Sequence, residues 1–325
     1  MELLLPFNIT PSSSKISYPD KILLIGSCFS EEVGNRLHDL KFNVLQNPNG
    51  ILYDPISITR SLNSYITNKH YCADEFFELN DLWHSWQHHS ALSGIKKEDV
   101  IQKINHSQDE AHSFLKDAKW LIVTAGTAYR YILSNSGEPV ANCHKAPSSF
   151  FTKELLAIEH IVSELSSTIS NLQPFNPDLK IIFTISPVRH VRDGVIENNR
   201  SKARLIEAVQ VIKDQFEMVS YFPAYEIIID VLRDYRFYKT DRVHPTEEAT
   251  GFVFEQFCNA YLDHSSLDSL EKIKKLNAAM KHKPFNESGM AHQKFKTAQL
   301  ENIKRLKNTF PFISFSKEEE YFSNE

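Results

Sequence analysis

Short apolar runs of strand length alternate along this chain with longer segments whose apolar residues repeat at helical spacing. The runs predict strands at 21–26, 42–46, 119–125, 179–185 and 217–221. The other segments predict helices at 30–40, 55–67, 151–172, 199–216 and 246–262. Runs that are apolar throughout are typical of parallel strands buried on both faces. We therefore expect an α/β fold with a doubly wound, flavodoxin-like parallel sheet flanked by helices.

The carboxyl ends of the predicted strands are where this fold places its ligands. Several residues with useful chemistry follow those ends directly. They are Cys28, Gly50, Gly126, Ser186 and the loop that carries His244. The order of the sequence thus predicts one functional edge of the sheet.

Cys28 stands in a Gly-Ser-Cys turn between the first predicted strand and the first predicted helix. Backbone N–H groups and the positive end of a helix dipole surround a thiol in such a turn. We expect that environment to lower the pKa of Cys28 and to make it a nucleophile. The alternative is that Cys28 is a small buried hydrophobic residue, as most free cysteines are.

Asp241 and His244 form an Asp-x-x-His pair ahead of the final predicted helix of this region. An aspartate three residues before a histidine, on a loop entering a helix, lets both side chains approach one point. The carboxylate can then fix the imidazole tautomer while the other ring nitrogen faces a nucleophile. Asp-x-x-His pairs also arise by chance. The significance of this pair comes from its position directly before an amphipathic helix.

The motif Gly-Ser-Cys-Phe-Ser at 26–30 and the motif Asp-x-x-His-Pro at 241–245 together resemble the SGNH/GDSL hydrolase superfamily. More narrowly, they resemble the GSCFA family, and the resemblance spans roughly residues 20 to 262. In the superfamily the first block reads Gly-Asp-Ser, with serine as the nucleophile. Aligned on the glycine, Ser27 takes the aspartate position and Cys28 the nucleophile position. This register favours Cys28 over Ser27 without deciding between them.

The resemblance also implies an oxyanion hole. Gly50 matches the glycine whose N–H contributes to that hole, although a turn glycine is the plain alternative. Gly126 matches the glycine of the third block, but Ala128 stands where that block has an asparagine. Losing one oxyanion donor typically lowers turnover by about 10²–10³. Thr127 or Asn142 are the candidates to replace the missing donor.

The loop at 186–194 follows a clean apolar run and carries Arg189 and His190. Its basic side chains could hold an anionic substrate group, the arginines in bidentate fashion. His190 is also a rival to His244 as the general base. The alternative is a solvated loop stabilised by pairing between arginine and aspartate.

The segment 83–89 is the densest cluster of aromatic and histidine residues. On a helix, His84 and His88 would share one face and could bind a metal, but no neighbouring carboxylate ligand is evident. A pocket wall and a plain packed surface are the alternatives. The four cysteines are scattered, which makes a zinc site or a disulfide improbable. We expect no metal and no cofactor.

The chain divides, on this interpretation, into an α/β domain at 1–263 and a helical extension at 264–325. A helical, aromatic-rich insertion is predicted at about 53–118. Two helical stripes are expected in the extension, with a break at 284–289. They would pack back on the main domain or support a homodimer contact. A flexible tail is expected beyond Lys317.

Composition excludes several partners. The chain has 325 residues and a net charge of −5, which gives no argument for nucleic-acid binding. Its apolar runs are far shorter than the roughly 20 residues of a membrane helix. The N-terminus has neither a basic start nor a small-residue cleavage site, so we expect a cytoplasmic protein without a membrane partner.

These observations favour an esterase, acyl hydrolase or acyltransferase. Cys28 would attack an acyl ester to form a thioester, with His244 as base and Asp241 as its orienting partner. The resemblance implies carbohydrate or lipid esters as the substrate class, and nothing in the residues selects one. The alternative is a catalytically inactive binding protein with the same fold. Ala128 and the replacement of serine by Cys28 favour that alternative, whereas the retained Asp241 and His244 oppose it.

Overall fold

The computed structural model describes residues 5–282, 285–286 and 289–323. At its centre lies a five-stranded sheet in the order β10-β9-β5-β1-β2, in which all neighbouring strands are parallel. These strands are β1 (Lys21–Gly26), β2 (Asn43–Gln46), β5 (Trp120–Ala125), β9 (Lys180–Ile185) and β10 (Val219–Phe222). The order is the flavodoxin-like one, with its switch point between β1 and β5. The predicted doubly wound α/β fold is confirmed.

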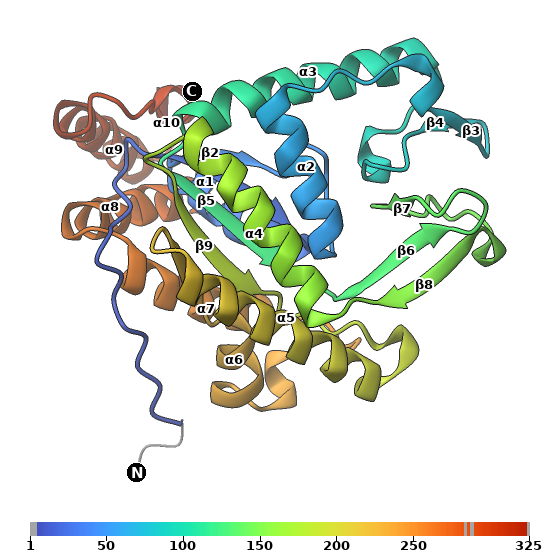
Figure 1. Ribbon diagram of the computed structural model, residues 1–325. Coiled ribbons are helices and arrows are strands. Elements are labelled where there is room, and N and C mark those ends of the chain that lie inside the picture. Colours follow the sequence, from blue (N-terminus) through green and yellow to red (C-terminus); the bar gives the residue numbers. More distant parts are fainter. Residues whose placement is uncertain (1–4, 283–284, 287–288, 324–325) are drawn as a thin grey trace.

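Helices cover both faces of this sheet (Figure 1). One layer consists of α2 (Pro55–Thr67), α3 (Lys97–Asp117), α4 (Ile158–Phe175) and α5 (Val195–Gln215). The other contains α1 (Cys28–Asp39), α7 (Glu247–Tyr261), α8 (His264–Lys281) and α9 (Met290–Thr309), with the short helices α6 (Ala224–Glu226) and α10 (Ser316–Ser323).

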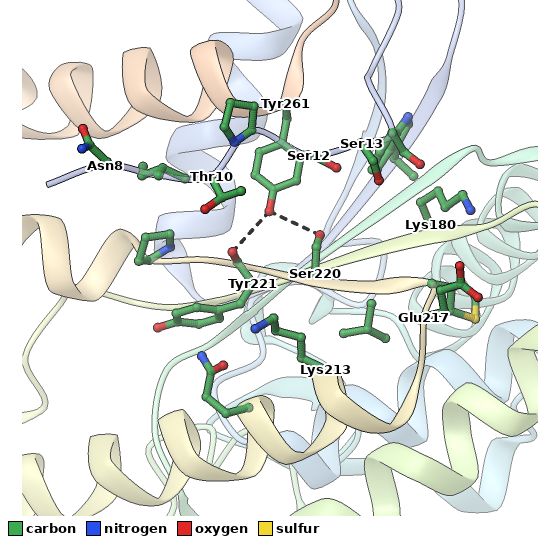
Figure 2. Close-up of a pocket in the computed structure, with 18 of the residues that line it drawn as sticks. Asn8, Thr10, Ser12, Ser13, Lys180, Lys213, Glu217, Ser220, Tyr221 and Tyr261 are labelled. Atoms are coloured by element: carbon green, nitrogen blue, oxygen red, sulfur yellow. Dashed lines mark hydrogen bonds between the residues drawn. The ribbon is translucent and has the colours of Figure 1, made fainter.

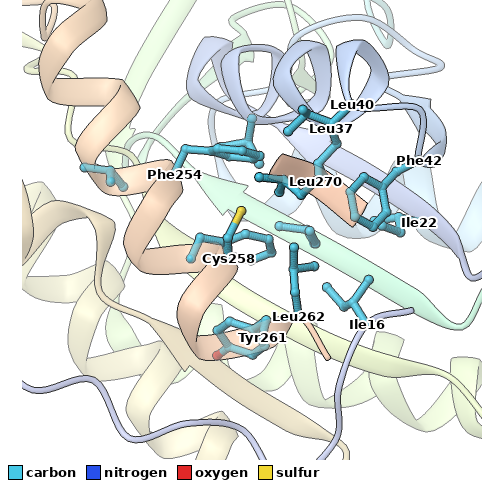
Figure 3. Close-up of a cluster of buried hydrophobic side chains, with 14 of the residues drawn as sticks. Ile16, Ile22, Leu37, Leu40, Phe42, Phe254, Cys258, Tyr261, Leu262 and Leu270 are labelled. Carbon is cyan, nitrogen blue, oxygen red and sulfur yellow. The ribbon is translucent and has the colours of Figure 1, made fainter. Parts of the chain in front are cut away.

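The two hydrophobic cores follow from the two-residue period of the strands. In β1, Ile22 and Leu24 point to the core with α1 and α7, whereas Leu23 and Ile25 point to the opposite core. Figure 3 shows the first core, where Cys258 of α7 packs among aromatic and aliphatic side chains. Cys258 is therefore a packing residue, as free cysteines often are.

Several helix starts are fixed by local side-chain caps. The Asp54 carboxylate accepts hydrogen bonds from the N–H groups of Ile56 and Ser57, and Pro55 occupies the first turn of α2. Thr246 caps α7 in the same way through the N–H of Ala249. Capping satisfies N–H groups that have no partner inside the helix, so these residues fix where each helix begins.

A smaller antiparallel sheet was not predicted. It contains β6 (Tyr129–Leu133), β7 (Pro139–Val140) and β8 (Phe151–Leu155), and it projects beyond the carboxyl ends of the central strands (Figure 1). The helix predicted at 151–172 is therefore wrong over its first residues, and α4 begins at Ile158. The strand β8 pairs with β6, which is distant in sequence, so the local pattern of residues did not predict β8.

The insertion at 53–118 contains α2 and α3, as expected, and also a hairpin of β3 (Phe77–Leu79) and β4 (Leu82–His84). His84 and His88 do not lie on one helix, which the metal-site alternative required, because β4 ends at His84 and a turn follows. Trp86 stacks on Phe77 with ring centroids 3.7 Å apart. The buried rings of His84 and His144 lie 4.4 Å apart in the same cluster. This cluster is a packed aromatic core of the insertion.

The C-terminal helices pack against the main core through buried residues such as Ile273, Ile303 and Phe315. Residues 283–284 and 287–288, inside the predicted break, lie outside the described residues. The tail that was expected to be flexible forms helix α10, where Phe322 is buried. Lys41 and Glu318 form an ion pair between the main domain and this helix, with their charged atoms 2.7 Å apart.

Candidate active site

The turn between β1 and α1 requires glycine at its first position. Gly26 has a φ of +136°, and a Cβ there would lie 2.1 Å from the carbonyl oxygen of Thr124. Ser27 follows as the N-cap residue of α1, but its side chain makes no cap and its Oγ has no partner among the described residues. Cys28 is the first residue of the helix and is half-buried. The sequence-predicted strand–turn–helix is therefore present.

The pKa of the Cys28 thiol is raised, contrary to the sequence-based expectation. Burial is the main cause and the neighbouring carboxylate of Glu31 is the second. The backbone N–H groups of Phe29 and Cys28 and the ammonium of Lys202 act in the opposite direction. The helix N-terminus thus favours the thiolate, but desolvation outweighs it. A base is consequently needed to ionise Cys28 at neutral pH.

Asp241 and His244 have the predicted arrangement. One carboxylate oxygen of Asp241 lies 2.7 Å from Nδ1 of His244, and the other accepts the N–H groups of Val243 and His244. These bonds lower the pKa of Asp241 below its usual range. The carboxylate therefore stays ionised and orients a half-exposed imidazole whose Nε2 points away from it.

Arg189 joins this loop to the carboxyl end of β9. Its backbone N–H donates to the carbonyl oxygen of Val243, and its guanidinium donates to the carbonyl oxygen of Arg242 at 3.2 Å. The same guanidinium lies 4.2 Å from the centre of the Tyr238 ring. Arg189 therefore positions the loop of His244, a role that differs from the substrate contact expected from the sequence.

Gly126 and His190 meet at the carboxyl end of β5. A Cβ on Gly126 would lie 3.3 Å from Nε2 of His190, Cβ of Ser27 and Cδ1 of Tyr53. A side chain at position 126 would thus make contacts tighter than ordinary van der Waals contacts, and this close approach brings four segments together. Burial, followed by the charge of Lys202, lowers the pKa of His190 to about 4, so its ring is neutral at pH 7. His190 packs edge-on against Tyr53 and is electrostatically coupled to His244.

Most N–H groups that were expected to bind the oxyanion already donate hydrogen bonds to other residues of the protein. The N–H of Gly50 donates to the carbonyl oxygen of Asn47 at 2.7 Å. The N–H groups of Gly126 and Thr127 both donate to the carbonyl oxygen of Tyr53. The Thr127 hydroxyl is bonded to Ser201. Gly50 and Thr127 are therefore corrected from oxyanion donors to residues that hold the loops together.

Asn142 is the other residue that was expected to replace the missing asparagine. Its side-chain oxygen Oδ1 accepts from the N–H of His144 and from the Ser90 hydroxyl. Among the described residues, no hydrogen bond joins Asn142 or His244 to Cys28. The first turn of α1 still offers N–H groups next to the sulfur, because the first N–H groups of a helix have no partner inside it.

Lys202 belongs to the site, although its position in the sequence marked it only as a polar residue near the start of a helix. It is 1% exposed, and its ammonium donates to the carbonyl oxygens of Gly126 and Ser186, each at 2.6 Å. Burial lowers its pKa to about 7, and Cys28 is its main electrostatic partner. No carboxylate pairs with Lys202 in the described part of the chain. A lysine in an apolar helical stripe was the available signal.

Two cavities lie at opposite ends of the sheet. One, of about 410 Å³, opens beside Thr127 and His190 at the carboxyl ends of the strands. The other, of about 430 Å³, follows the edge strand β10 to the amino ends of β5 and β9 at Trp120 and Lys180. Figure 2 shows this second cavity, where the Tyr261 hydroxyl is bonded to Ser220 and Tyr221. Only the first cavity adjoins the predicted site residues.

Within the described residues, no group of three or more histidine, cysteine, aspartate or glutamate side chains gathers as a metal-binding set. In the same residues, no helix combines the length and the apolar character that crossing a bilayer requires.

The fold and the site define a class of protein: parallel α/β, with a thiol at the end of β1 and an Asp-His pair before α7. The chain belongs to the GSCFA family, whose model matches residues 21–257. A second model, the C-terminal domain of GSCFA domain proteins, matches residues 273–325. No match was found among curated proteins.

Solved structures with a remote likeness include a carbohydrate esterase of family 3 from Talaromyces cellulolyticus. It is 10% identical with a TM-score of 0.35, and the match covers 79% of this chain and 99% of that one. A putative acylhydrolase from Bacteroides fragilis is 10% identical with a TM-score of 0.37, covering 78% and 91%. An acetyl xylan esterase from Butyrivibrio proteoclasticus has the same identity and TM-score, covering 75% and 64%.

Proposed function

We propose that this protein is an acyl hydrolase or acyltransferase that acts on esters through a thioester on Cys28. The observation that carries the proposal is the 2.7 Å hydrogen bond between Asp241 and Nδ1 of His244. A carboxylate on Nδ1 leaves Nε2 as the proton acceptor, which is the arrangement that a nucleophile with a raised pKa requires. Arg189 holds this loop at the sheet edge that carries Cys28.

Cys28 is the more suitable nucleophile of the two neighbouring residues. Ser27 is 0% exposed, whereas Cys28 is half-buried, and the first-turn N–H groups and the charge of Lys202 both lower the pKa of its thiol. A buried serine hydroxyl cannot reach an ester that arrives from solvent. Ser27 then serves to close the turn, since its carbonyl oxygen accepts from the N–H of Ser30 at 2.8 Å.

His244 is the more suitable base. The low pKa of His190 means that its imidazolium would hold a proton only weakly. His190 also lies where Gly126 and Tyr53 enclose it. In contrast, His244 is half-exposed and oriented by Asp241. His190 is assigned to the wall of the site.

The proposed reaction has two steps. Nε2 of His244 accepts the Cys28 proton, Sγ attacks the carbonyl carbon, and the tetrahedral oxyanion faces the first-turn N–H groups of α1. The C–O bond breaks, and the leaving alkoxide takes the proton from His244. In the second step His244 accepts a proton from water, the resulting hydroxide attacks the thioester, and Cys28 leaves as the thiol with that proton. An acceptor alcohol in place of water gives acyl transfer.

A stopped-flow assay with 4-nitrophenyl acetate tests the proposal. Wild-type protein should release nitrophenol in a burst that approaches one equivalent, because acylation by this activated ester should be faster than hydrolysis of the thioester. Cys28→Ala should abolish the burst, and His244→Ala should slow it by about 10²–10⁴. A burst that survives in Cys28→Ala would move the nucleophile elsewhere. Cys258→Ala is the matched control, since Cys258 is buried in the core.

The second candidate function is a binding protein that has lost its chemistry. The engaged N–H groups of Gly50 and Gly126 favour it, because an oxyanion hole with fewer donors is weaker. This candidate predicts no burst with any ester, together with ligand binding that survives in Cys28→Ala.

A further inference from the structure

The cavity beside His190 lies between a small sheet that the sequence did not predict and a loop that it did. The β6–β8 sheet forms one side, and the loop from β9 to α5 forms the other. Its volume of about 410 Å³ falls in the range of small-molecule sites. Thr127, His190 and Val243 line it, and Val243 directly precedes the proposed base. The cavity therefore lies beside the loop that carries the proposed base, although Cys28 and His244 are not among its lining residues.

Cations dominate the charged groups of the cavity. Lys153, Arg189 and Arg192 line it, and Asp193 is the only carboxylate among its described lining residues. Lys153 forms an ion pair with Asp193, and the guanidinium of Arg189 is engaged by Tyr238 and the loop of the proposed base. Arg192 has no carboxylate partner in the described structure. An excess of positive charge therefore remains in the cavity.

Two tyrosine rings give the cavity a flat wall. Tyr129 and Tyr131 come from β6, and Lys153 of the neighbouring β8 lies 4.3 Å and 5.6 Å from their ring centres. The Tyr129 hydroxyl is bonded to the carboxylate of Glu197, which fixes that ring. Fixed aromatic rings suit the contact of a planar or cyclic group.

The charge of this cavity is opposite in sign to the net charge of the whole chain. The protein carries a net charge of −5, yet this edge of the sheet concentrates arginine and lysine. A concave cationic site on an acidic protein attracts anions locally and raises their rate of encounter. Guanidinium groups bind carboxylates and phosphates through paired hydrogen bonds, which also select for geometry.

We propose that this cavity binds an anionic group, a carboxylate or a phosphate, carried next to a ring on the ester substrate. Arg192 and Lys153 recognise the anion, and Tyr129 and Tyr131 contact the ring. The inference rests on the proposed function in one respect, because it places the ester carbonyl at Cys28 and the anionic part beside His190. It narrows the substrate to esters of acidic compounds.

The test compares two aryl acetates, 4-acetoxybenzoate and its methyl ester, whose para groups differ in charge, each rate being divided by the rate of the same ester with a free thiol in solution. Wild-type protein should be acylated by the anionic ester with about tenfold higher kcat/KM. Arg192→Gln should remove most of that preference by raising KM for the anionic ester, with little change for the neutral one. Lys213→Gln is the matched control, because Lys213 lines the cavity at the opposite end of the sheet.

Asp193→Asn should change KM for the anionic ester in the direction opposite to Arg192→Gln. It removes the one carboxylate of the cavity, so it should lower KM for the anionic ester about two- to fivefold. Equal rates for both esters in the wild type, or an anionic preference that survives in Arg192→Gln, would overturn the inference and leave the proposed function intact.

Direct binding separates failure of the inference from failure of the proposed function. Calorimetry with Cys28→Ala should show binding of 4-hydroxybenzoate or phenyl phosphate, which distinguishes the two anions, and none of methyl 4-hydroxybenzoate. Binding that is lost in Arg192→Gln, in a protein that no ester acylates, would support the cavity and overturn the thioester reaction. Equal binding of the neutral compound, or no binding of either anion, would overturn the cavity assignment.

Discussion

The buried ammonium group of Lys202 donates a 2.6 Å hydrogen bond to the carbonyl oxygen of Gly126. Gly126 itself lies against Ser27, Tyr53 and His190, and Ser27 directly precedes Cys28 in the turn, so the lysine is tied to the segment that packs against this turn. A second bond of the same length, to Ser186, ties this point to the end of β9. The proposed nucleophile is therefore electrostatically coupled to a buried lysine that pairs with no carboxylate among the described residues and whose pKa burial lowers to about 7.

Lys202→Met should make Cys28 less reactive. Lys202 lowers the pKa of the thiol, and Glu31 raises it, so the two substitutions must act in opposite directions. Alkylation by iodoacetamide at pH 7 should be about threefold or more slower in Lys202→Met and faster in Glu31→Gln, since the thiolate is the reactive form. The pH profile of alkylation measures both. Shifts in the same direction would remove Lys202 from this role.

Asp241→Asn should lower kcat/KM for acylation by about 10²-fold or more. The amide can present an N–H to Nδ1 of His244, which moves the ring proton to Nε2 and removes the proton acceptor. Because the pair is half-exposed, the unfolding midpoint in urea should barely change. Asp234→Asn is the matched control, since Asp234 is an exposed aspartate that also accepts a backbone N–H in the preceding turn. A similar loss in both variants would indicate general damage to the loop.

His190→Gln should flatten the dependence of stability on pH. The pKa of His190 is about 4 in the folded protein and near 6.5 when exposed, so between these values the unfolded chain binds more protons. Stability therefore rises with pH across this window and is lost as pH falls through it. One pKa unit corresponds to about 1.4 kcal/mol.

Denaturant titrations from pH 4 to pH 7 measure this slope in the wild type and in His190→Gln. His88 and His144 are also buried with lowered pKa values and add slope of the same sign. The variant should therefore have a smaller slope and keep a residual one. An unchanged slope would show that His190 is accessible to protons in the folded state.

Gly50→Ala and Gly137→Ala separate two costs of replacing a glycine. Both residues have φ values near +70°, which disfavours alanine by about 1 kcal/mol. At Gly50 a Cβ would also lie 2.3 Å from Cβ of His89, whereas at Gly137 it would meet no described atom within 4 Å. Urea unfolding should show a loss of about 1 kcal/mol for Gly137→Ala and about 2–4 kcal/mol for Gly50→Ala. Equal losses would contradict the packing of Gly50 against His89.

The central sheet was predictable because its strands are apolar on both faces. After Lys21 the residues of β1 are all apolar or glycine, and after Lys180 the apolar run of β9 is interrupted only by Thr184. A turn follows each strand, so the apolar run and its end both predicted the strand. The strand β8 was missed because Phe151–Leu155 alternates only weakly and pairs with β6 across a long loop. When a strand pairs with a distant segment, its own residues need not alternate between apolar and polar, so the local pattern does not predict it.

At the site, the sequence predicted the Asp241–His244 bond because that geometry is local to one turn. It did not predict that the Gly50 N–H is bonded to Asn47, since any glycine after a strand has the same local pattern. It also predicted the wrong direction for the pKa of Cys28. Burial by surrounding segments outweighs the helix N-terminus, and burial depends on the whole fold.

The most direct test of the central claim is intact-protein mass spectrometry after mixing with 4-nitrophenyl acetate, followed by peptide mapping of the adduct. The thioester account predicts a gain of one acetyl group on Cys28. That gain should disappear in Cys28→Ala, form more slowly in His244→Ala and be unchanged in Cys72→Ala, which removes an exposed cysteine outside the site. An acetyl group found on Ser27, or no adduct on a folded protein, would contradict the claim that Cys28 is the nucleophile.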